Sequence, residues 1–357
     1  MDFIRNIPRA IGVIVIIFGL GVAWLWIEIQ TFADTPLQFA DSEYRYTIEP
    51  GKTLKRISRE LQQQGLIENA DKLVWLARLQ GNANHILLGE YEFNQGNTVQ
   101  DLLNKFVTGD VKRYSLTLVE GWNIYQVLEA IDADPILEHR LRGLSHAQIM
   151  VKLGHPDEHP EGRFFPDTYQ FSRGMSDIEF LKRAYDKMEQ VLEDEWSRRS
   201  NALPYRNPYE ALIMASIVEK ETAVPSERGA IAGVFVRRIE KQMRLQTDPT
   251  VIYGLGQSFD GNLKKRHLLD AGNPYNTYKL KGLPPTPIAL AGREAIEAAL
   301  NPKDGDALYF VSRGDGSHYF SASLDEHNQA VVKYQLKGRV RQTTSMNADG
   351  SSKKDLR

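Results

Sequence analysis

The segment Ala215-Ser216-Ile217-Val218-Glu219-Lys220-Glu221-Thr222 places two carboxylates at the end of an otherwise apolar helix. A buried Glu without a partner is costly, so it either pairs with a cation or keeps its proton. A Glu that keeps its proton near neutral pH is a candidate general acid. The segment therefore predicts a catalytic carboxyl group at the edge of an apolar core.

The residues before this segment encode the start of the helix. Asn207 is a suitable N-cap, Pro208 suits the first helical position, and Glu210 follows the cap by three residues. Pro225 forbids further helix beyond the two carboxylates. Because both limits are fixed, the register of the helix can be predicted.

The register separates the two carboxylates. At about 100° per residue, Glu221 continues the bulkier apolar stripe, whereas Glu219 lies on roughly the opposite side. The first side carries Ala211, Met214, Ile217 and Val218, and the second carries Leu212, Ala215 and Ser216. Glu221 is the favoured catalytic residue, and the helix dipole would help to keep it protonated in the last turn. In the alternative interpretation both acids are solvated and pair with Lys220 or Arg228.

The composition excludes several classes of protein. The chain has 357 residues and 42% hydrophobic content, enough for one membrane segment and two or three compact units. Its 44 basic and 46 acidic residues give a net charge of −2, and no basic cluster is interleaved with aromatic residues, so nucleic acid is not an expected partner. The absence of cysteine excludes disulfides, thiolate metal sites and a cysteine nucleophile.

An apolar and glycine-containing run from Ile11 to Ile27 predicts a membrane anchor. Two arginines precede the run and two acidic residues follow it, which predicts a cytoplasmic N-terminus and an exported remainder. These residues are Arg5, Arg9, Glu28 and Asp34. A cleaved signal peptide is the alternative, but the apolar core is long for one and no small-x-small cleavage site follows it. We therefore expect a cytoplasmic N-terminus at residues 1–10, an uncleaved single-pass anchor at 11–30 and a linker at 31–43.

A strand-turn-helix pattern occurs three times after the linker. It covers Tyr46–Leu54, Tyr91–Val99 and Leu116–Ile124, each with a short alternating strand, a Gly turn and a Thr or Asn that can cap the next helix. The pattern predicts small α+β modules over residues 44–153, which resemble LysM-type glycan-binding domains. A plain spacer between the membrane and an active domain is the alternative interpretation.

Aromatic, Pro and polar residues gather in loops from about Gly154 onward, which marks the expected start of a catalytic domain at 154–340. We expect a helix from Ser176 to Ser197, and a later helix capped by Ser226. The inner side of the later helix would carry Ile231, Val234, Phe235 and Ile239. A terminal hairpin is expected around residues 314–316, and the polar tail at 341–357 is predicted to be disordered.

Four motifs in this order resemble the bacterial endolytic murein transglycosylases of the YceG-like family. They are Ser216–Thr222, Arg244–Tyr253, Tyr275–Tyr278 with Gly282–Pro285, and the His318-Tyr319-Phe320 loop that ends at His327-Asn328. The resemblance covers almost the whole chain. It implies an α+β protein with an N-terminal transmembrane helix, a LysM-like stalk and a lysozyme-like lytic transglycosylase domain with added β elements. It also implies a bacterial inner-membrane location with a periplasmic catalytic domain, and association with peptidoglycan synthases (penicillin-binding proteins).

The resemblance also implies a set of site residues. In lytic transglycosylases a Ser or Thr directly follows the catalytic Glu, and Glu221-Thr222 matches this pattern whereas Glu219-Lys220 does not. The residues expected to line the cleft are Gln246, Thr247, Asp248, Tyr275, Asn276 and Tyr278. Phe164, Phe165 and Pro166 are expected to form a wall of the same groove.

The expected reaction needs one carboxyl group and no cofactor or metal. Glu221 would protonate the glycosidic oxygen between N-acetylmuramic acid and N-acetylglucosamine, then take the proton of the muramoyl 6-hydroxyl, leaving a 1,6-anhydro end in nascent peptidoglycan. One alternative is a hydrolytic muramidase in which Asp248 supplies the second carboxylate. Another is a noncatalytic glycan-binding scaffold. Metal catalysis is disfavoured because Pro156 and Pro160 place His155 and His159 in a loop.

Overall fold

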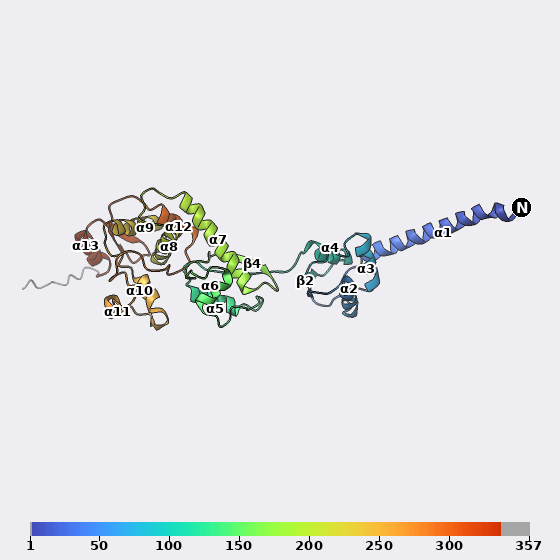
Figure 1. Cartoon of the computed structure of the whole chain (residues 1–357), viewed down its shortest axis with the longest axis horizontal. Helices are drawn as coiled ribbons and strands as arrows, with labels where there is room; N and C mark the ends of the chain where they lie inside the picture. The colour runs from blue at the N-terminus through green and yellow to red at the C-terminus, as the bar shows by residue number, and fades with distance from the viewer. Residues whose placement is uncertain (1, 337–357) are drawn as a thin grey trace, which may run out of the picture. The chain divides into compact units, whose positions relative to one another are not determined.

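The protein is a mixed α and β structure, seen here in a computed structural model that describes residues 2–336 (Figure 1). Contacts between residues divide it into two compact units. The first unit comprises Met1–Leu116, Asp134–Arg140 and Tyr169–Phe180, and the second comprises Thr117–Ala133, Leu141–Thr168 and Leu181–Arg357. The chain first leaves the first unit after Leu116 and returns to it at 134–140 and 169–180. The tail predicted at 341–357 lies outside the described residues.

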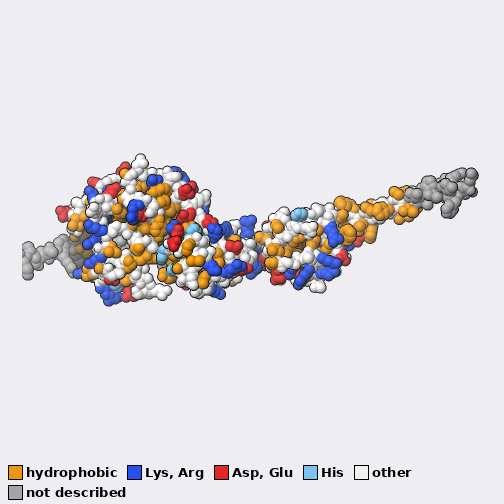
Figure 2. Space-filling model, in the orientation of Figure 1, with side chains coloured by type: hydrophobic (Ala, Val, Ile, Leu, Met, Phe, Trp, Pro, Cys, Tyr) orange, Lys and Arg blue, Asp and Glu red, His pale blue; other side chains and the backbone are white. Residues whose placement is uncertain are grey.

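Helix α1 (Asp2–Ala33) carries the predicted apolar run. Its segment Gly12–Ala33 is long and apolar enough to cross a membrane. Its hydrophobic side chains are largely exposed from Val13 to Ile27, and Figure 2 shows them along the helix. The linker expected at 31–43 is only partly a linker, because Phe32 and Leu37 are buried in the first unit. Burial of these two apolar side chains stabilises the packing of residues 32–37 against the core of the first unit.

The first unit confirms two of the three strand-turn-helix repeats. Its elements are β1 (Glu43–Ile48), α2 (Leu54–Gln63), α3 (Ala70–Leu79), β2 (Gly89–Asn94) and α4 (Val99–Thr108). Strands β1 and β2 pair antiparallel, with Tyr46 opposite Tyr91. Thr53 caps α2, and Thr98 caps α4 in a reciprocal pair with Asp101, as the capping pattern predicts. Together the two repeats enclose one aromatic core around Phe106.

The third repeat forms locally, but its strand belongs to a separate two-stranded sheet. Strand β3 (Arg113–Thr117) pairs with β4 (Thr168–Ser172). Asn123 and Gln126 then cap α5 (Ile124–Ala133) reciprocally. The Gln126 N–H donates to Asn123 Oδ1 at 3.1 Å, and the Asn123 N–H donates to Gln126 Oε1 at 3.0 Å. Helix α6 (His146–Leu153) follows with a capping box at Ser145. Local capping therefore reproduces the repeat, whereas its strand pairs with β4 and not with β1 or β2.

The second unit is built around α8 (Pro208–Glu221). The other elements are α7 (Asp177–Ser197), α9 (Pro225–Glu240), α10 (Asp248–Leu255), η1 (Gly256–Ser258), α11 (Lys265–Leu269), α12 (Arg293–Leu300), β5 (Tyr309–Ser312), β6 (His318–Ser321) and α13 (Leu324–Tyr334). Helix α8 packs against α9, α10 and α12. Residues 211–218 are all buried, so the apolar stripe expected on one side extends around the whole helix. Small side chains on α12, such as Ala295 and Ala299, allow it to pack closely against α8.

The predicted helix limits hold for α8 but only partly for α9. The Asn207 side chain accepts the Glu210 N–H at 3.0 Å at the start of α8. The predicted cap at Ser226 is wrong, because α9 already begins at Pro225 and has no side-chain cap. Proline suits this first position because its fixed φ is helical and it has no N–H to satisfy. The predicted terminal hairpin is confirmed as the antiparallel pair β5 and β6.

Candidate active site

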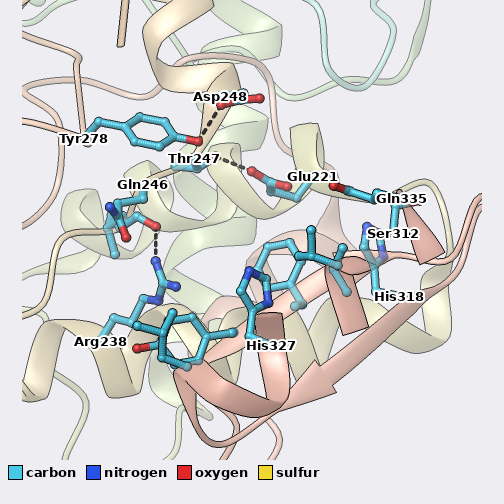
Figure 3. A pocket seen from close by; sticks show the side chains of 16 residues that line it. Glu221, Arg238, Gln246, Thr247, Asp248, Tyr278, Ser312, His318, His327 and Gln335 are labelled. Atoms are coloured by element: carbon cyan, nitrogen blue, oxygen red, sulfur yellow. Dashed lines mark hydrogen bonds between the residues drawn. The ribbon is translucent and has the colours of Figure 1, made fainter. Parts of the chain in front are cut away.

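Glu221, the last residue of α8, faces a pocket of about 490 Å³ in the second unit (Figure 3). The Thr247 hydroxyl donates a hydrogen bond to Glu221 Oε1. Of the predicted cleft residues, the pocket brings Gln246, Thr247, Asp248 and Tyr278 together with Glu221. The remaining lining comes mainly from the hairpin and α13, namely Tyr309, Phe310, Val311, Ser312, His318, Leu324, His327, Val331 and Gln335.

Burial raises the pKa of Glu221, and the negative charge of Asp248 raises it further. The hydrogen bond from Thr247 lowers this pKa, as do His318 and Arg238. Burial is the largest of these effects. The carboxyl group therefore holds its proton to a higher pH than an exposed Glu, as a general acid requires.

Glu219 has a different environment. Its side chain is 7% exposed, accepts the Gly292 N–H at 3.0 Å and lies 3.6 Å from Arg228 Nη2. Burial raises the pKa of Glu219 as well, so the pKa alone does not separate the two acids. The contacts of the two acids separate them. The charge of Glu219 is balanced by Arg228 and by the Gly292 N–H at the start of α12, and Glu219 does not line the pocket.

A strained turn brings Thr247 to Glu221. Gln246 has a φ of +54°, in the left-handed region that non-glycine residues rarely adopt. The Gln246 N–H donates to the Thr277 carbonyl at 3.2 Å, and the Thr247 N–H donates to Thr277 Oγ1 at 3.1 Å. These bonds hold the turn and fix Thr247, which is 3% exposed, at the start of α10. The Glu221 carboxyl therefore has a positioned hydroxyl donor.

Asp248 and Tyr278 form a second polar pair in the pocket. The Tyr278 hydroxyl donates to Asp248 Oδ1 at 2.6 Å, as Figure 3 shows. Asp248 lies in the first turn of α10, where the helix dipole stabilises a negative charge. Burial and the Asp248 carboxylate both raise the pKa of Tyr278. Asp248 is exposed to the pocket and keeps acceptor capacity for a ligand.

The structure does not bring Tyr275 and Asn276 into this pocket. The Asn276 amide donates to the carbonyls of His267 and Asp270 at 3.1 and 2.6 Å, at the end of α11. The Tyr275 hydroxyl is 2.8 Å from Thr286 Oγ1. These contacts hold the loop that carries Tyr278 and the Thr277 groups described above.

The expected aromatic wall is wrong. Phe164 is fully buried and Phe165 is 9% exposed, and neither these residues nor Pro166 line the pocket. Phe165 packs in the core of the second unit because its apolar ring gains more from burial than from a polar groove. His155 and His159 lie in the loop before this segment, as predicted.

Arg238 joins the two walls of the pocket and was not among the residues predicted from the sequence. Its Nε donates to the Leu308 carbonyl at 2.7 Å, and its Nη1 donates to the Leu245 carbonyl at 2.6 Å. The side chain is largely buried and lies over the Tyr309 ring. The sequence signal that could have indicated Arg238 is its place as a charged residue near apolar positions of α9, such as Val236, that are buried.

His318 was noted only as part of a motif. Its Nδ1 lies 2.7 Å from Glu227 Oε2, and its backbone N–H donates to Glu227 Oε1 at 2.9 Å. Glu227 therefore holds both the backbone and the ring of a histidine that lines the same pocket as Glu221.

Comparison with known proteins agrees with the predicted family. The sequence matches the YceG-like family over residues 46–333. It is 32% identical over 311 residues to the endolytic murein transglycosylase of Bacillus subtilis (strain 168), covering 80% of this chain and 83% of the relative. It is 26% identical to the protein of the same name from Streptococcus pneumoniae, covering 80% of this chain but only 57% of that relative's length.

A solved structure supports the same assignment. The crystal structure of a YceG-like protein from Listeria monocytogenes is 28% identical and superposes with a TM-score of 0.52, covering 81% of this chain and 99% of that one. The family match covers most of the chain and includes the pocket residues from Glu221 to Val331. The chain belongs to the YceG-like family.

Proposed function

We propose that this protein is a membrane-anchored endolytic murein transglycosylase that cuts peptidoglycan glycan strands and so terminates their elongation. The observation that carries the proposal is the carboxyl group of Glu221, whose pKa is raised by burial and which Thr247 holds at a polar pocket. The relatives named endolytic murein transglycosylase support the reaction class.

Glu221 acts first as an acid and then as a base. The protonated carboxyl gives its proton to the glycosidic oxygen, and the bond from this oxygen to C1 of N-acetylmuramic acid breaks. The carboxylate then accepts the proton of the 6-hydroxyl of the same sugar, whose oxygen bonds to C1. The product is a 1,6-anhydro ring, and no water is consumed. The intramolecular nucleophile has a high effective concentration, so a second carboxylate is not required to activate water.

The other pocket residues would position the sugar. The Thr247 hydroxyl binds one oxygen of Glu221, which leaves the second oxygen for the substrate. The carboxylate of Asp248 would stabilise positive charge that develops at C1, and Tyr278 holds that carboxylate in place. Gln246 contributes an exposed amide for hydroxyl and acetamido groups. We assign Tyr275 and Asn276 to the support of the cleft loop rather than to direct contact.

The hydrolytic alternative retains one specific observation. Asp248 lines the same pocket as Glu221 and could hold a water molecule for attack at C1. Its bond to Tyr278 already occupies one oxygen, which favours the electrostatic role. The ends of the released glycans distinguish the two, since hydrolysis leaves reducing ends and transglycosylation leaves anhydro ends.

We also propose how the rest of the chain serves this reaction. The order β1-α2-α3-β2, with the two strands paired antiparallel, supports a LysM-like glycan-binding stalk within residues 44–153. Within residues 154–340, the helices packed around α8 would form a lysozyme-like domain, to which β5 and β6 add a hairpin. The charge asymmetry around the apolar run supports a single pass at residues 11–30 through the inner membrane, with residues 1–10 cytoplasmic and the active site periplasmic. Peptidoglycan synthases are the expected neighbours.

Activity of the Glu221→Gln variant tests the proposal. The full-length protein in detergent is incubated with purified sacculi, and the soluble glycans are quantified. Loss of the transferable proton should lower cleavage at least about a hundredfold. Glu297→Gln is the matched control, because Glu297 is an exposed residue of α12 outside the pocket. Cleavage by Glu221→Gln at the level of the control would remove Glu221 from the mechanism, and binding without cleavage by the unmodified protein would favour the scaffold interpretation.

A further inference from the structure

A second pocket of about 530 Å³ lies in the same unit as Glu221. It is lined by three aromatic rings and by polar and cationic side chains. The residues that matter here are Asn123, Tyr125, Lys220, Pro249, Tyr253 and Phe259. None of them lines the first pocket.

The two pockets adjoin through two helices. At the end of α8, Lys220 lines the second pocket and Glu221 lines the first. At the start of α10, Asp248 lines the first pocket and Pro249 lines the second. Consecutive helical residues are about 1.5 Å apart along the axis and diverge by about 100°. The second pocket therefore lies close to Glu221, on another side of the same two helix ends.

A buried carboxyl group braces the walls of the second pocket. Glu161 is fully buried, and its Oε2 accepts the N–H of Ile124, the residue before Tyr125, at 3.1 Å. Glu161 also interacts with the Tyr253 side chain on α10. One side chain thus links the start of α5 to α10. Such a brace fixes the separation of the two tyrosines that form the walls.

The lining suits a sugar rather than a peptide helix or a polyanion. Tyr125 is 53% exposed and rests on the His146 ring, with centroids 5.1 Å apart, so part of its ring remains free to contact a ligand. Aromatic faces bind the apolar faces of pyranose rings, while amide and carboxylate groups at the rim bind hydroxyls. Asn123, Gln126 and Glu129 supply these rim groups. Lys220 is the one Lys or Arg among the described lining residues, too few for a polyanion site.

We propose that the second pocket binds sugars of the same glycan strand beyond the bond cut at Glu221. This inference rests on the proposed function and adds a substrate property to it. A strand long enough to fill both pockets gains contacts that a short oligosaccharide lacks. The enzyme should therefore prefer long strands, which is the behaviour that internal cleavage of a polymer requires.

Replacement of Tyr125 tests the inference. The full-length protein in detergent is assayed on peptide-free glycan strands, either long or trimmed to tetrasaccharides, and kcat/KM is measured for each. The unmodified protein should prefer long strands. Tyr125→Ala should reduce this preference about tenfold, the scale of one aromatic contact. Tyr125→Trp should restore it, since the larger ring retains stacking.

The controls distinguish this inference from the proposed function. Leu269→Ala removes an apolar side chain of α11 that is 55% exposed and lines neither pocket, and the preference should be unchanged. Equal preference for both substrates by the unmodified protein, or equal losses on both substrates in Tyr125→Ala, would overturn the second-pocket assignment while leaving cleavage itself intact. A length effect seen only with peptide-bearing strands would also overturn it, because the occupant would then be the stem peptide. Absence of cleavage on every substrate would instead refute the proposed function.

Discussion

Replacing Thr247 by Val should shift the pH dependence of the enzyme upward. The Thr247 hydroxyl donates to Glu221 Oε1, and this bond lowers the pKa of a carboxyl group that burial raises. A hydrogen bond to a charged, buried group is worth about 1.5–3 kcal/mol. Since about 1.4 kcal/mol corresponds to one pKa unit, its loss should raise the pKa of Glu221 by about one to two units.

The sign follows from the role of Glu221 as an acid. Activity is present below its pKa and is lost as the pH rises through that value. The alkaline limb of kcat/KM against pH, measured on purified glycan strands, should therefore move upward by about one to two units in Thr247→Val. Thr247→Ser keeps the hydroxyl and should leave the limb in place.

Thr250→Val is the matched control for this experiment. Thr250 is fully buried in α10, three residues after Thr247, and its hydroxyl binds the Thr247 carbonyl and Thr277 rather than Glu221. It should lower thermal stability without moving the limb. An alkaline limb that stays fixed or moves downward in Thr247→Val would refute the assignment of Thr247 as the partner that tunes Glu221.

Further substitutions separate stability from chemistry. Glu219→Gln should lower the free energy of unfolding by about 1–3 kcal/mol, because it weakens the contacts with Arg228 and Gly292. The folded fraction should still cleave glycan, and complete loss of cleavage in a folded variant would contradict a purely structural role for Glu219. Asn207→Ala should destabilise α8 by about 1 kcal/mol in thermal unfolding while Asn207→Asp should not, and equal stability of both would show that the cap contributes nothing. Burial raises the pKa of Glu161 from 4.5 to about 7. Between these two pH values the folded state therefore binds more protons than the unfolded state, so the free energy of unfolding should fall as the pH rises from about 4.5 to about 7. Glu161→Gln should flatten this dependence by up to about 3 kcal/mol in denaturant titrations at the two pH values, and an unchanged slope would argue against a protonated Glu161.

Local signals in the sequence predicted local structure well. The caps at Thr53, Thr98 and Asn207 are all found, because each cap depends on residues three positions away. The two carboxylates of α8 could be separated from helical geometry alone. Ser226 was the exception, since Pro225 offered an equally local and stronger start signal.

Long-range pairing could not be predicted in the same way. The third repeat has the local pattern of the first two, but β3 pairs with β4, which lies about fifty residues further along the chain. Nothing in the local pattern of residues 113–124 encodes this partner. The buried Phe164 and Phe165 illustrate the same limit, because an aromatic side chain suits a sugar platform and a core equally well until its neighbours are known.

Residues that are adjacent in the chain could be grouped from the sequence. Gln246, Thr247 and Asp248 are consecutive, and all three line the pocket that contains Glu221. Arg238 and His318 were missed because their roles depend on backbone carbonyls and on Glu227, which are distant in sequence. A single sequence carries no direct signal for such contacts.

The source of the oxygen atoms at the new glycan end tests the central claim most directly. Sacculi are digested by the full-length protein in water enriched in heavy oxygen, and the released glycans are weighed by mass spectrometry. Attack by the sugar's own 6-hydroxyl predicts anhydro ends without heavy oxygen. Reducing ends that carry one heavy oxygen atom would show that water attacks C1, and would contradict the account of Glu221 as the single acid and base of a transglycosylase.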